Sequence, residues 1–298
     1  MKMQFRAPLA KRIDALCAEA FPEHSRNYFH YLIEEGMVTC NGKRIKKREI
    51  PNVGDLIEVV FKTLPEITLT PEPIPLEILY EDEEVLCINK PPQMVVHPAP
   101  GNPSGTLVNA LLHYCHSLPP QELRPGIVHR LDKETSGVLL AAKTSFAHQK
   151  LLAAFAARKV QKEYLAVTAG TPQKLSLNAP IGRHPVKRKE MTLREDGREA
   201  LTHFEVLEEH HGITLLRVRP ITGRTHQIRV HLKSLNTPIL GDSIYGSEKL
   251  SKKEGVKRLL LHAHRLTFPH PSQEKLMTIT APIPEDFKKW IRGGIPSL

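Results

Sequence analysis

Cysteine and long apolar runs are scarce in this sequence, and acidic side chains are outnumbered by basic ones. The four cysteines are scattered and form no Cys-x-x-Cys pair, which argues against a redox motif and against a disulfide framework. No apolar run reaches the roughly 18 residues that a membrane-spanning helix needs. Basic residues interrupt the N-terminal segment, so no signal-peptide core is recognisable. We therefore expect a cytoplasmic protein with reduced thiols and no membrane association.

Motifs for nucleotide and metal binding are missing as well. The sequence contains no Gly-x-x-x-x-Gly-Lys-Ser/Thr phosphate loop. His226 and His231 do not form a His-Glu-x-x-His zinc motif, because no Glu follows His226 and the two histidines are five residues apart. His262 and His264 share one face of a predicted strand, but no Cys or carboxylate set with metal-ligand spacing accompanies them. We therefore expect neither a metal nor another cofactor, and a metal-dependent nuclease is disfavoured.

Positive charge is abundant. Lys and Arg number 42 against 32 Asp and Glu, which gives a formal net charge of +10. A surplus of this sign favours polyanionic partners, because basic side chains neutralise phosphates. Charge alone does not separate nucleic acid from an anionic membrane surface. With 298 residues the chain is long enough for two domains with their own cores.

Residues 9–61 have the pattern of a small separate domain. Apolar residues recur at helical spacing across 9–21 and 28–33, and Gly36 is a natural helix stop. A short strand then enters an Asn-Gly turn at residues 41–42. Basic residues gather after this turn, namely Lys43, Arg44, Lys46, Lys47 and Arg48. These basic residues could contact a polyanion such as RNA, or they could simply belong to a charged hairpin exposed to solvent.

Four prolines follow within residues 62–76, and repeated proline favours an extended, semi-rigid spacer. We predict a small domain over 1–62, a linker over 63–76 and a second domain over 77–298. In the second domain, strand patterns recur at residues 85–89, 138–142, 164–168, 200–207, 213–218, 259–266 and 276–280. Helical patterns at 108–112 and 228–235 do not alternate with them regularly. The pattern predicts an α+β fold with a largely antiparallel sheet.

Three segments of this second domain carry candidate chemistry. In residues 124–144, Asp132 lies between Arg130 and Lys133, and a turn and a buried strand follow, so its carboxylate is presented at a sheet edge. Residues 162–167 alternate as a strand that contains Tyr164. Residues 222–231 form a basic, amphipathic helical pattern that contains Arg229. A loop Asp, a core Tyr and an ordinary basic helix are the alternatives at the three positions.

Taken in order, these segments resemble the motifs of pseudouridine synthases of the ribosomal large-subunit type, most closely type D. The resemblance implies a pseudouridine synthase fold with a mixed, largely antiparallel central sheet. It implies that Asp132 is the catalytic aspartate, that Tyr164 stacks on the target base and removes a proton, and that Arg229 pairs with the carboxylate. It leaves open whether Asp132 attacks the base, attacks the sugar or abstracts a sugar proton. Arg130 would fill the space that a flipped uridine leaves.

The resemblance extends to RNA binding. Residues 9–61 resemble the S-four-type RNA-binding domain, a small α+β module first described in a ribosomal protein. Beside Arg130 and the basic run after the turn, the residues expected to contact RNA are Arg183, Lys187 and Arg188 in an inserted segment, and Arg224 in the third motif. The expected partner is structured RNA, namely 23S ribosomal RNA or a large-subunit precursor particle, bound by a monomer.

Two alternatives stay open at this point. The same chemistry could act on transfer RNA or on another structured RNA. A non-catalytic RNA-binding factor of ribosome assembly would also fit the basic charge and the N-terminal domain. The intact set of Asp132, Tyr164 and Arg229 favours an enzyme.

Overall fold

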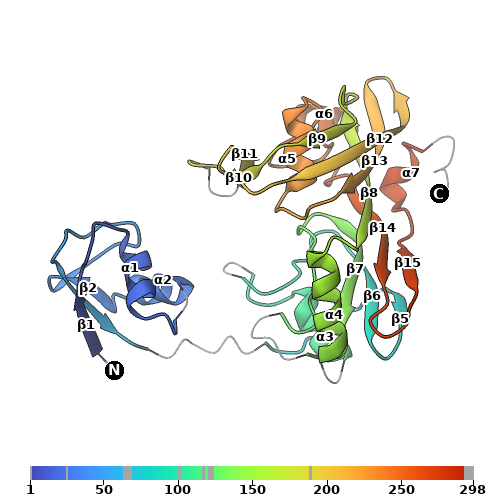
Figure 1. Cartoon of the computed structure of the whole chain (residues 1–298). Helices are drawn as coiled ribbons and strands as arrows, with labels where there is room; N and C mark the ends of the chain where they lie inside the picture. The colour runs from blue at the N-terminus through green and yellow to red at the C-terminus, as the bar shows by residue number, and fades with distance from the viewer. Residues whose placement is uncertain are drawn as a thin grey trace. The chain divides into compact units, whose positions relative to one another are not determined.

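The computed structural model describes residues 2–24, 26–62, 69–99, 102–115, 118–119, 124–187 and 190–291. The chain divides into two compact units between residues 68 and 69 (Figure 1). The division falls within the stretch predicted as a linker. Two residues of that stretch form hydrogen bonds with Asn109. The Thr70 carbonyl accepts one from the Asn109 side chain (2.8 Å), and the Glu72 amide donates one to the Asn109 carbonyl (3.0 Å). Residues 70–72 therefore pack within the second unit, to which they belong, and the predicted domain limits stay a prediction.

The N-terminal unit is a small α+β domain. Its elements are β1 Lys2–Arg6, α1 Ile13–Ala20, α2 Arg26–Glu34, β2 Val38–Cys40, β3 Lys43–Arg44 and β4 Leu56–Val60. The strands pair antiparallel in the order β1-β4-β2-β3. Asn41 and Gly42 both have positive φ (49° and 72°), as a tight hairpin between β2 and β3 requires. The two helices pack on the sheet through an apolar core that includes Ile13, Phe29 and Ile57.

A buried carboxylate ties the two helices of this unit together. Asp14 on α1 accepts hydrogen bonds from the guanidinium groups of Arg12 and Arg26, and His30 on α2 contacts it at 2.6 Å. Burial alone would raise the pKa of Asp14, but the hydrogen bonds from Arg26, His30 and Arg12 outweigh it and hold that pKa well below its usual range. The charge is therefore paired rather than exposed to an apolar core.

The second unit is built on one large sheet. Its elements are β5 Ile78–Glu81, β6 Val85–Lys90, α3 Leu107–Tyr114, β7 Ser136–Ala142, α4 Ser145–Ala156, β8 Gln161–Ala169, β9 Ser176–Asn178, β10 Ile181–Arg183, β11 Met191–Leu193, β12 Leu201–His210, β13 Ile213–Pro220, α5 Gln227–Ser234, α6 Glu248–Lys253, β14 Leu261–Pro269, β15 Leu276–Thr280 and α7 Glu285–Lys288. In the described residues the sheet order is β5-β6-β7-β14-β8-β13-β12-β9, with β15 paired to β14. Only β7 and β14 run parallel within it. The predicted α+β fold with a largely antiparallel sheet is confirmed.

Both faces of the β6–β7 pair are buried, which explains their nearly continuous apolar sequences. One face packs against α4 through residues that include Val138, Leu140 and Leu151. The other face packs against α3 through residues that include Leu139 and Leu107. Figure 1 shows the two helices on this end of the sheet, and α5 and α6 near its other end beside β12 and β13.

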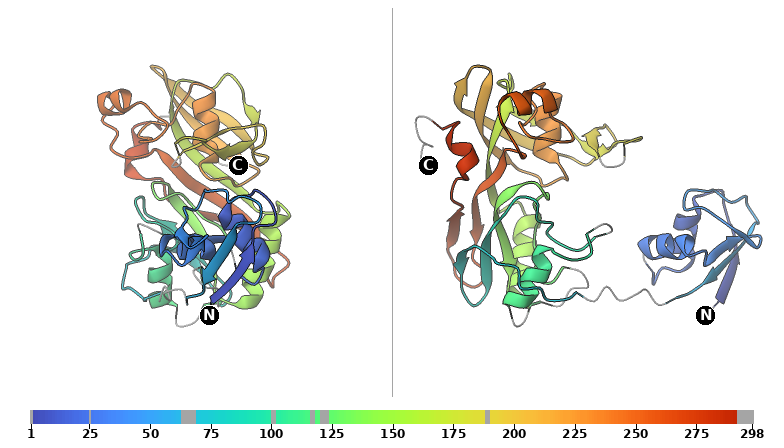
Figure 2. Two further views of the ribbon diagram at one scale, coloured as in Figure 1. Left: turned by 90° about the vertical axis from the view of Figure 1, so that its left-hand side faces the viewer. Right: turned by 180° about the vertical axis from the view of Figure 1, so that it is seen from behind.

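The hairpin β10–β11 stands apart from the main sheet. Its two strands pair with each other, Ile181 also forms an isolated bridge with Arg198, and the hairpin projects from the body of the second unit (Figure 2, right, in yellow). Two contacts nevertheless hold the base of the hairpin against the rest of the second unit. The His231 ring on α5 is 3.1 Å from the Ala179 carbonyl, and the Met191 amide donates to the Tyr245 hydroxyl at 2.7 Å.

Candidate active site

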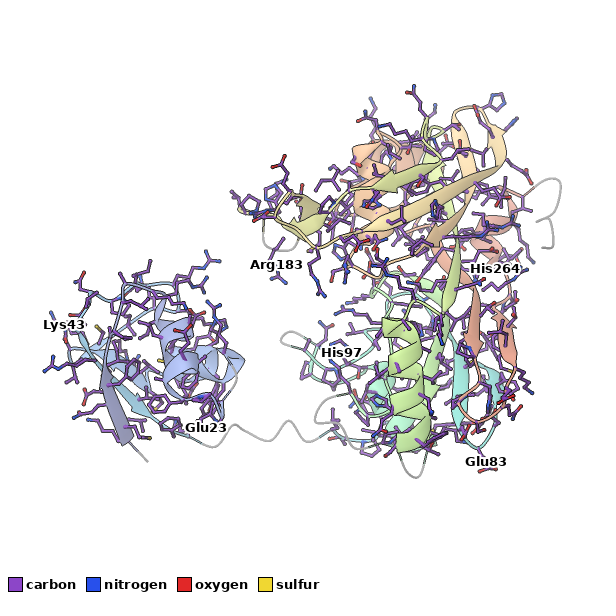
Figure 3. All side chains as sticks on the ribbon, in the orientation of Figure 1. Glu23, Lys43, Glu83, His97, Arg183 and His264 are labelled. Atoms are coloured by element: carbon purple, nitrogen blue, oxygen red, sulfur yellow. The ribbon has the colours of Figure 1, made fainter. Side chains whose placement is uncertain are left out.

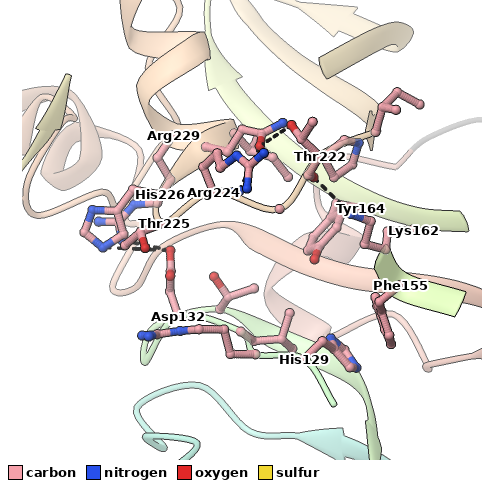
Figure 4. Close-up of a pocket in the computed structure, with 18 of the residues that line it drawn as sticks. His129, Asp132, Phe155, Lys162, Tyr164, Thr222, Arg224, Thr225, His226 and Arg229 are labelled. Atoms are coloured by element: carbon pink, nitrogen blue, oxygen red, sulfur yellow. Dashed lines mark hydrogen bonds and ion pairs between the residues drawn. The ribbon is translucent and has the colours of Figure 1, made fainter. Parts of the chain in front are cut away.

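A cleft of about 500 Å³ opens where the three motifs of the second unit meet. The loop before β7, strand β8, and the loop that leads into α5 form its walls, and Figure 4 shows them converging. Asp132, Tyr164 and Arg229 all line this cleft, although they are far apart in the sequence. The structure therefore brings together the three residues that the sequence singled out.

Asp132 is held by the turn that starts β7. The Thr135 amide donates to the Asp132 carbonyl at 3.1 Å, and the Asp132 side chain stays 17% exposed toward the cleft. Gly137, at the start of β7, has φ of +112°, and a Cβ there would lie 2.2 Å from the Ala263 carbonyl oxygen. Only glycine fits such a conformation at such close backbone contact. The sharp turn before the strand is what projects the carboxylate.

A buried lysine supports the same turn from behind. Lys90 is fully buried at the end of β6, and its ammonium donates to the carbonyls of Pro91 (2.7 Å), Met94 (3.0 Å) and Lys133 (3.3 Å). Burial lowers the pKa of Lys90 to about 7, although the Asp132 charge opposes this shift. The residue next to Asp132 is thus tied to the loop that follows β6.

Arg229 is locked in place by a second carboxylate. Its Nε and Nη2 atoms donate to Asp242 at 2.7 Å and 2.8 Å, and both side chains are buried. Its Nη1 reaches Asp132 Oδ2 at 3.4 Å, and its Nη2 reaches Glu134 at 3.4 Å. Burial alone would raise the pKa of Asp242, but hydrogen bonds from Arg229 keep it below its usual value. A two-point fork of this kind fixes the guanidinium, which then faces Asp132.

Tyr164 forms another wall of the cleft. It lies on β8 opposite Val218 of β13 and Ala263 of β14, and its side chain is half-buried. Burial, with the nearby Asp132 charge, raises the pKa of the Tyr164 phenol. The phenol is therefore neutral at ordinary pH. It offers a flat ring for stacking, and its hydroxyl must give up its own proton before it can remove another.

Positively charged side chains outnumber negatively charged ones in the cleft. Among its lining residues, Asp132 is the only carboxylate, whereas the cations are Arg130, Arg158, Lys162, Arg224 and Arg229. Arg130 is exposed beside Asp132. A cationic cleft attracts a polyanion and concentrates it near the single carboxylate. In the described part of the chain, no three His, Cys, Asp or Glu side chains gather in a way that could hold a metal ion.

The other residues predicted to bind RNA lie outside the cleft. Arg183 and Lys187 are exposed on the β10–β11 hairpin, and Arg188 falls outside the described residues. In the N-terminal unit Lys43, Arg44, Lys46 and Arg48 are exposed, and Lys47 forms an ion pair with Glu34. Figure 3 labels Lys43 and Arg183 at the surfaces of their units. Their role in RNA binding stays a prediction.

Sequence reasoning missed several residues in the cleft and directly behind its wall. Glu134 and Asp242 hold Arg229, Lys162 lines the β8 wall, and His226 approaches Asp132 at 4.0 Å. The pairing of Asp242 with Arg229 depends on contacts that sequence spacing does not reveal. For Lys162 the signal was its position two residues before Tyr164, on the same strand face.

Residues 84–234 match the family described as RNA pseudouridylate synthase. The chain belongs to this family. Residues 11–57 match the S4 domain, in agreement with the resemblance of the N-terminal segment. The ribosomal large subunit pseudouridine synthase D of Xanthomonas campestris pv. campestris is 42% identical over 290 residues, which cover 94% of this chain and 87% of that protein. The protein of that name in Pasteurella multocida is 40% identical over 300 residues, covering 96% and 91%.

Solved structures agree with the fold of this family. Human RNA Pseudouridylate Synthase Domain Containing 1 is similar with a TM-score of 0.58 and 27% sequence identity, covering 70% of this chain and 84% of that one. Human RNA Pseudouridylate Synthase Domain Containing 4 gives 0.56 and 29%, covering 71% and 90%. The chain is therefore a pseudouridine synthase with an N-terminal RNA-binding domain, and its partner is RNA. No helix among the described residues is long and apolar enough to cross a membrane.

Proposed function

We propose that this pseudouridine synthase isomerises specific uridines of large-subunit, 23S ribosomal RNA. The observation that carries the proposal is one carboxylate, Asp132, held by Arg229 in a cleft that is otherwise lined with cations. The relatives named for the ribosomal large subunit support the choice of RNA. We further propose that the chain works as a monomer in the cytoplasm, on naked RNA or on a precursor particle.

The reaction requires little beyond a pocket and a carboxylate. The bond from uracil nitrogen 1 to the sugar breaks, the detached base rotates, and a new bond forms from carbon 5 to the same sugar carbon. The proton on carbon 5 is then lost. No oxidant, group donor or hydrolytic water takes part, so a closed pocket that retains the base serves the chemistry.

We assign roles to the three residues of the motifs. Asp132 acts directly on the nucleotide, as nucleophile toward sugar or base or as a base toward the sugar. Arg229 keeps Asp132 ionised, because a guanidinium opposes uptake of a proton by a shielded carboxylate. Tyr164 stacks on the uracil and takes part in removal of the carbon-5 proton. The uridine must leave its stack to reach them, and Arg130 occupies the vacated space.

Tritium release tests the proposal. Transcribed 23S ribosomal RNA carrying tritium at carbon 5 of uridine should lose label to water only where pseudouridine forms. We expect release with the purified protein, confined to a few uridines after mapping. Release from transfer RNA but not from ribosomal RNA would contradict the proposed substrate. No release from any structured RNA would contradict the catalytic role and favour an assembly factor.

A further inference from the structure

A cluster of cations on the β8 side of the cleft, Lys162, Arg224 and Arg158, has a single carboxylate nearby in the described part of the chain, that of Glu199 at the rim. Lys162 projects from β8 two residues before Tyr164, and Figure 4 shows both side chains on the cleft wall. The Lys162 ammonium donates to the Thr222 carbonyl at 2.9 Å, and Arg224 Nε donates to the Glu199 carbonyl at 2.8 Å. No carboxylate of the described residues lies within ion-pair distance of either cation. Only Arg158, at the rim, pairs with a carboxylate, that of Glu199 at 3.0 Å.

The charges of this cluster repel one another. Burial lowers the pKa of Lys162 to about 8, and the nearby Arg224 adds to the shift. Burial also lowers the pKa of Arg224; the Arg198 and Arg158 charges act in the same direction, and the Glu199 carboxylate opposes them only in part. Shielded like charges raise the free energy of the folded protein, and an anion placed among them would relieve it. The carbonyls that fix Lys162 and Arg224 hold the two side chains ready for such an anion.

We propose that Lys162, Arg224 and Arg158 form a subsite for one phosphodiester of the RNA strand, adjacent to the target nucleotide. This inference rests on the proposed function, because it assumes that the target base lies over Tyr164. Lys162 and Tyr164 lie on the same face of β8, about 7 Å apart along the strand, and both line the cleft, so a nucleotide whose base stacks on Tyr164 would bring its backbone near the cations. The subsite would hold the backbone while the base moves, which phosphate contacts do without reading sequence.

Binding across a salt series tests the subsite. Lys162→Met should weaken binding to a 23S ribosomal RNA transcript about tenfold at moderate salt. The slope of log affinity against log salt should become shallower by about 0.7 to 0.9, as loss of one phosphate contact predicts. Lys162→Arg should restore both values, and Lys174→Met, at an exposed position outside the cleft, should change neither. Unchanged affinity and slope in Lys162→Met would overturn the proposal.

A second readout separates this inference from the proposed function. The pKa of Lys162, followed by nitrogen NMR of labelled lysine, should rise when uridine monophosphate is added and should stay constant with uridine. An equal response to both would overturn the subsite. Because this measurement needs no turnover, a phosphate-specific response together with no tritium release would uphold the subsite and contradict the proposed function.

His226 faces Asp132 from the loop that precedes α5. It has a positive φ of 56°, a conformation that few residues other than glycine adopt, and this aims its ring into the cleft. Its Nδ1 is 2.8 Å from the Tyr245 hydroxyl, and its Nε2 is 4.0 Å from Asp132 Oδ2. The same Oδ2 atom faces Arg229 at 3.4 Å.

The hydrogen bonds around Tyr245 favour one of the two neutral forms of the His226 ring. The Tyr245 hydroxyl accepts the Met191 amide at 2.7 Å, and its remaining described partner is His226 Nδ1. We infer that the hydroxyl, which already accepts the Met191 amide, donates its own proton to Nδ1, because this arrangement uses both its donor and its acceptor. Burial lowers the pKa of His226, although Asp132 and Asp242 oppose the shift while Arg229 and Arg130 add to it. The lowered pKa favours a neutral ring, and the inferred hydrogen bond from Tyr245 places its proton on Nε2, toward Asp132.

We infer that His226 is a positioning residue for Asp132. A small closure on RNA binding would bring its Nε2–H within hydrogen-bond distance of Oδ2, and catalytic hydrogen bonds often tighten in this way. With Arg229 and His226 both on Oδ2, the Oδ1 atom of Asp132 is left to act on the nucleotide. The Met191 amide also links this relay to the β10–β11 hairpin.

Removing the hydroxyl of Tyr245 tests the relay. In the wild type, ring nitrogen NMR should show His226 with its proton on Nε2. Tyr245→Phe should give a mixture of tautomers and a single-turnover rate about tenfold lower at saturating RNA. Tyr80→Phe, which loses a hydroxyl bonded to Asp82 outside the cleft, should alter neither. His226→Gln, which keeps a donor, should retain more activity than His226→Leu. A proton found on Nδ1 in the wild type, or an unchanged rate in Tyr245→Phe, would overturn this role.

Discussion

At the scale of single residues, Arg229 connects the carboxylate of the cleft to the carboxylates behind it. It lies among the carboxylates of Asp132, Glu134 and Asp242, and only Asp242 binds it through two short hydrogen bonds. Asp242 in turn accepts the backbone amides of Ile244 and Tyr245. A buried ion pair of this kind adds little net stability, but removing one partner leaves an unbalanced charge in its place.

Arg229→Ala should therefore destabilise the protein as well as inactivate it. We expect the free energy of unfolding in urea to fall by about 3–5 kcal/mol, because the buried Asp242 carboxylate loses its partner. The matched control is Arg194→Ala, which breaks the exposed pair with Asp196 and should change stability little. An equal, small loss in both variants would contradict the description of Arg229 as the anchor of the site.

Lys90 predicts how stability depends on pH. Its pKa is about 7 in the folded protein and near 10.5 in the unfolded chain, so the unfolded chain binds more protons between these values. Its contribution to stability therefore rises with pH across that window, by at most about 1.4 kcal/mol per pH unit. Urea unfolding at pH 7, 8 and 9 should show wild-type stability increasing relative to that of Lys90→Met. A difference that stays constant, or falls, would mean that Lys90 is not held in a shielded site.

At the scale of elements, the pairing of β7 with β14 places the loop of Asp132. This parallel pairing consists of His262 opposite Ser136 and Ala263 opposite Gly137. It joins the half of the sheet that supplies Asp132 to β14 and through it to β8, which supplies Tyr164. The distance between the two residues across the cleft therefore depends on how closely these two strands approach.

Gly137→Ala should disturb that approach. The residue has positive φ, and its added Cβ would lie 2.2 Å from the Ala263 oxygen, so strain and steric overlap both act. We expect a loss of about 2–5 kcal/mol in urea unfolding. Gly212→Ala is the control, because it shares a positive φ but has nothing within 4 Å of its Cβ. If the two variants lose the same amount, strand packing at Gly137 is looser than described.

The order of the elements was largely predictable, and their pairing was not. Apolar alternation identified β6, β8 and β13 to within a few residues, because each strand carries its own pattern. Helix α4 was missed, since its many alanines give a weak periodic signal; the Thr144 side chain caps it by accepting the Ala147 amide. The parallel contact of β7 with β14 joins segments more than a hundred residues apart, and no local pattern encodes it.

The same limit applies to the cleft. Asp132, Tyr164 and Arg229 were identifiable because each lies in a recognisable motif, and the structure gathers them. The pairing of Arg229 with Asp242 and the approach of His226 to Asp132 depend on side-chain directions after folding. Sequence spacing says which residues share an element, but it does not say which elements meet.

At the scale of the whole molecule, the N-terminal unit and the second unit are expected to divide the work. Deleting residues 1–62 should weaken RNA binding more than it slows the chemical step, since the exposed basic residues of the hairpin supply no group suited to isomerisation. The salt dependence of binding should also become shallower, as fewer phosphates are neutralised. The measurement is binding over a salt series with single-turnover kinetics at saturating RNA. Unchanged affinity with a collapsed rate would mean that the small domain supports the active site directly.

The most direct test of the whole account is Asp132→Asn. Asparagine keeps the size of the side chain and removes its charge, so the turn and the cleft should persist. We expect tritium release from 23S ribosomal RNA to fall to the level without enzyme, and RNA affinity to stay within about threefold of the wild type, because the cations that line the cleft are untouched. Near-normal release by Asp132→Asn would contradict the central claim that this carboxylate performs the isomerisation.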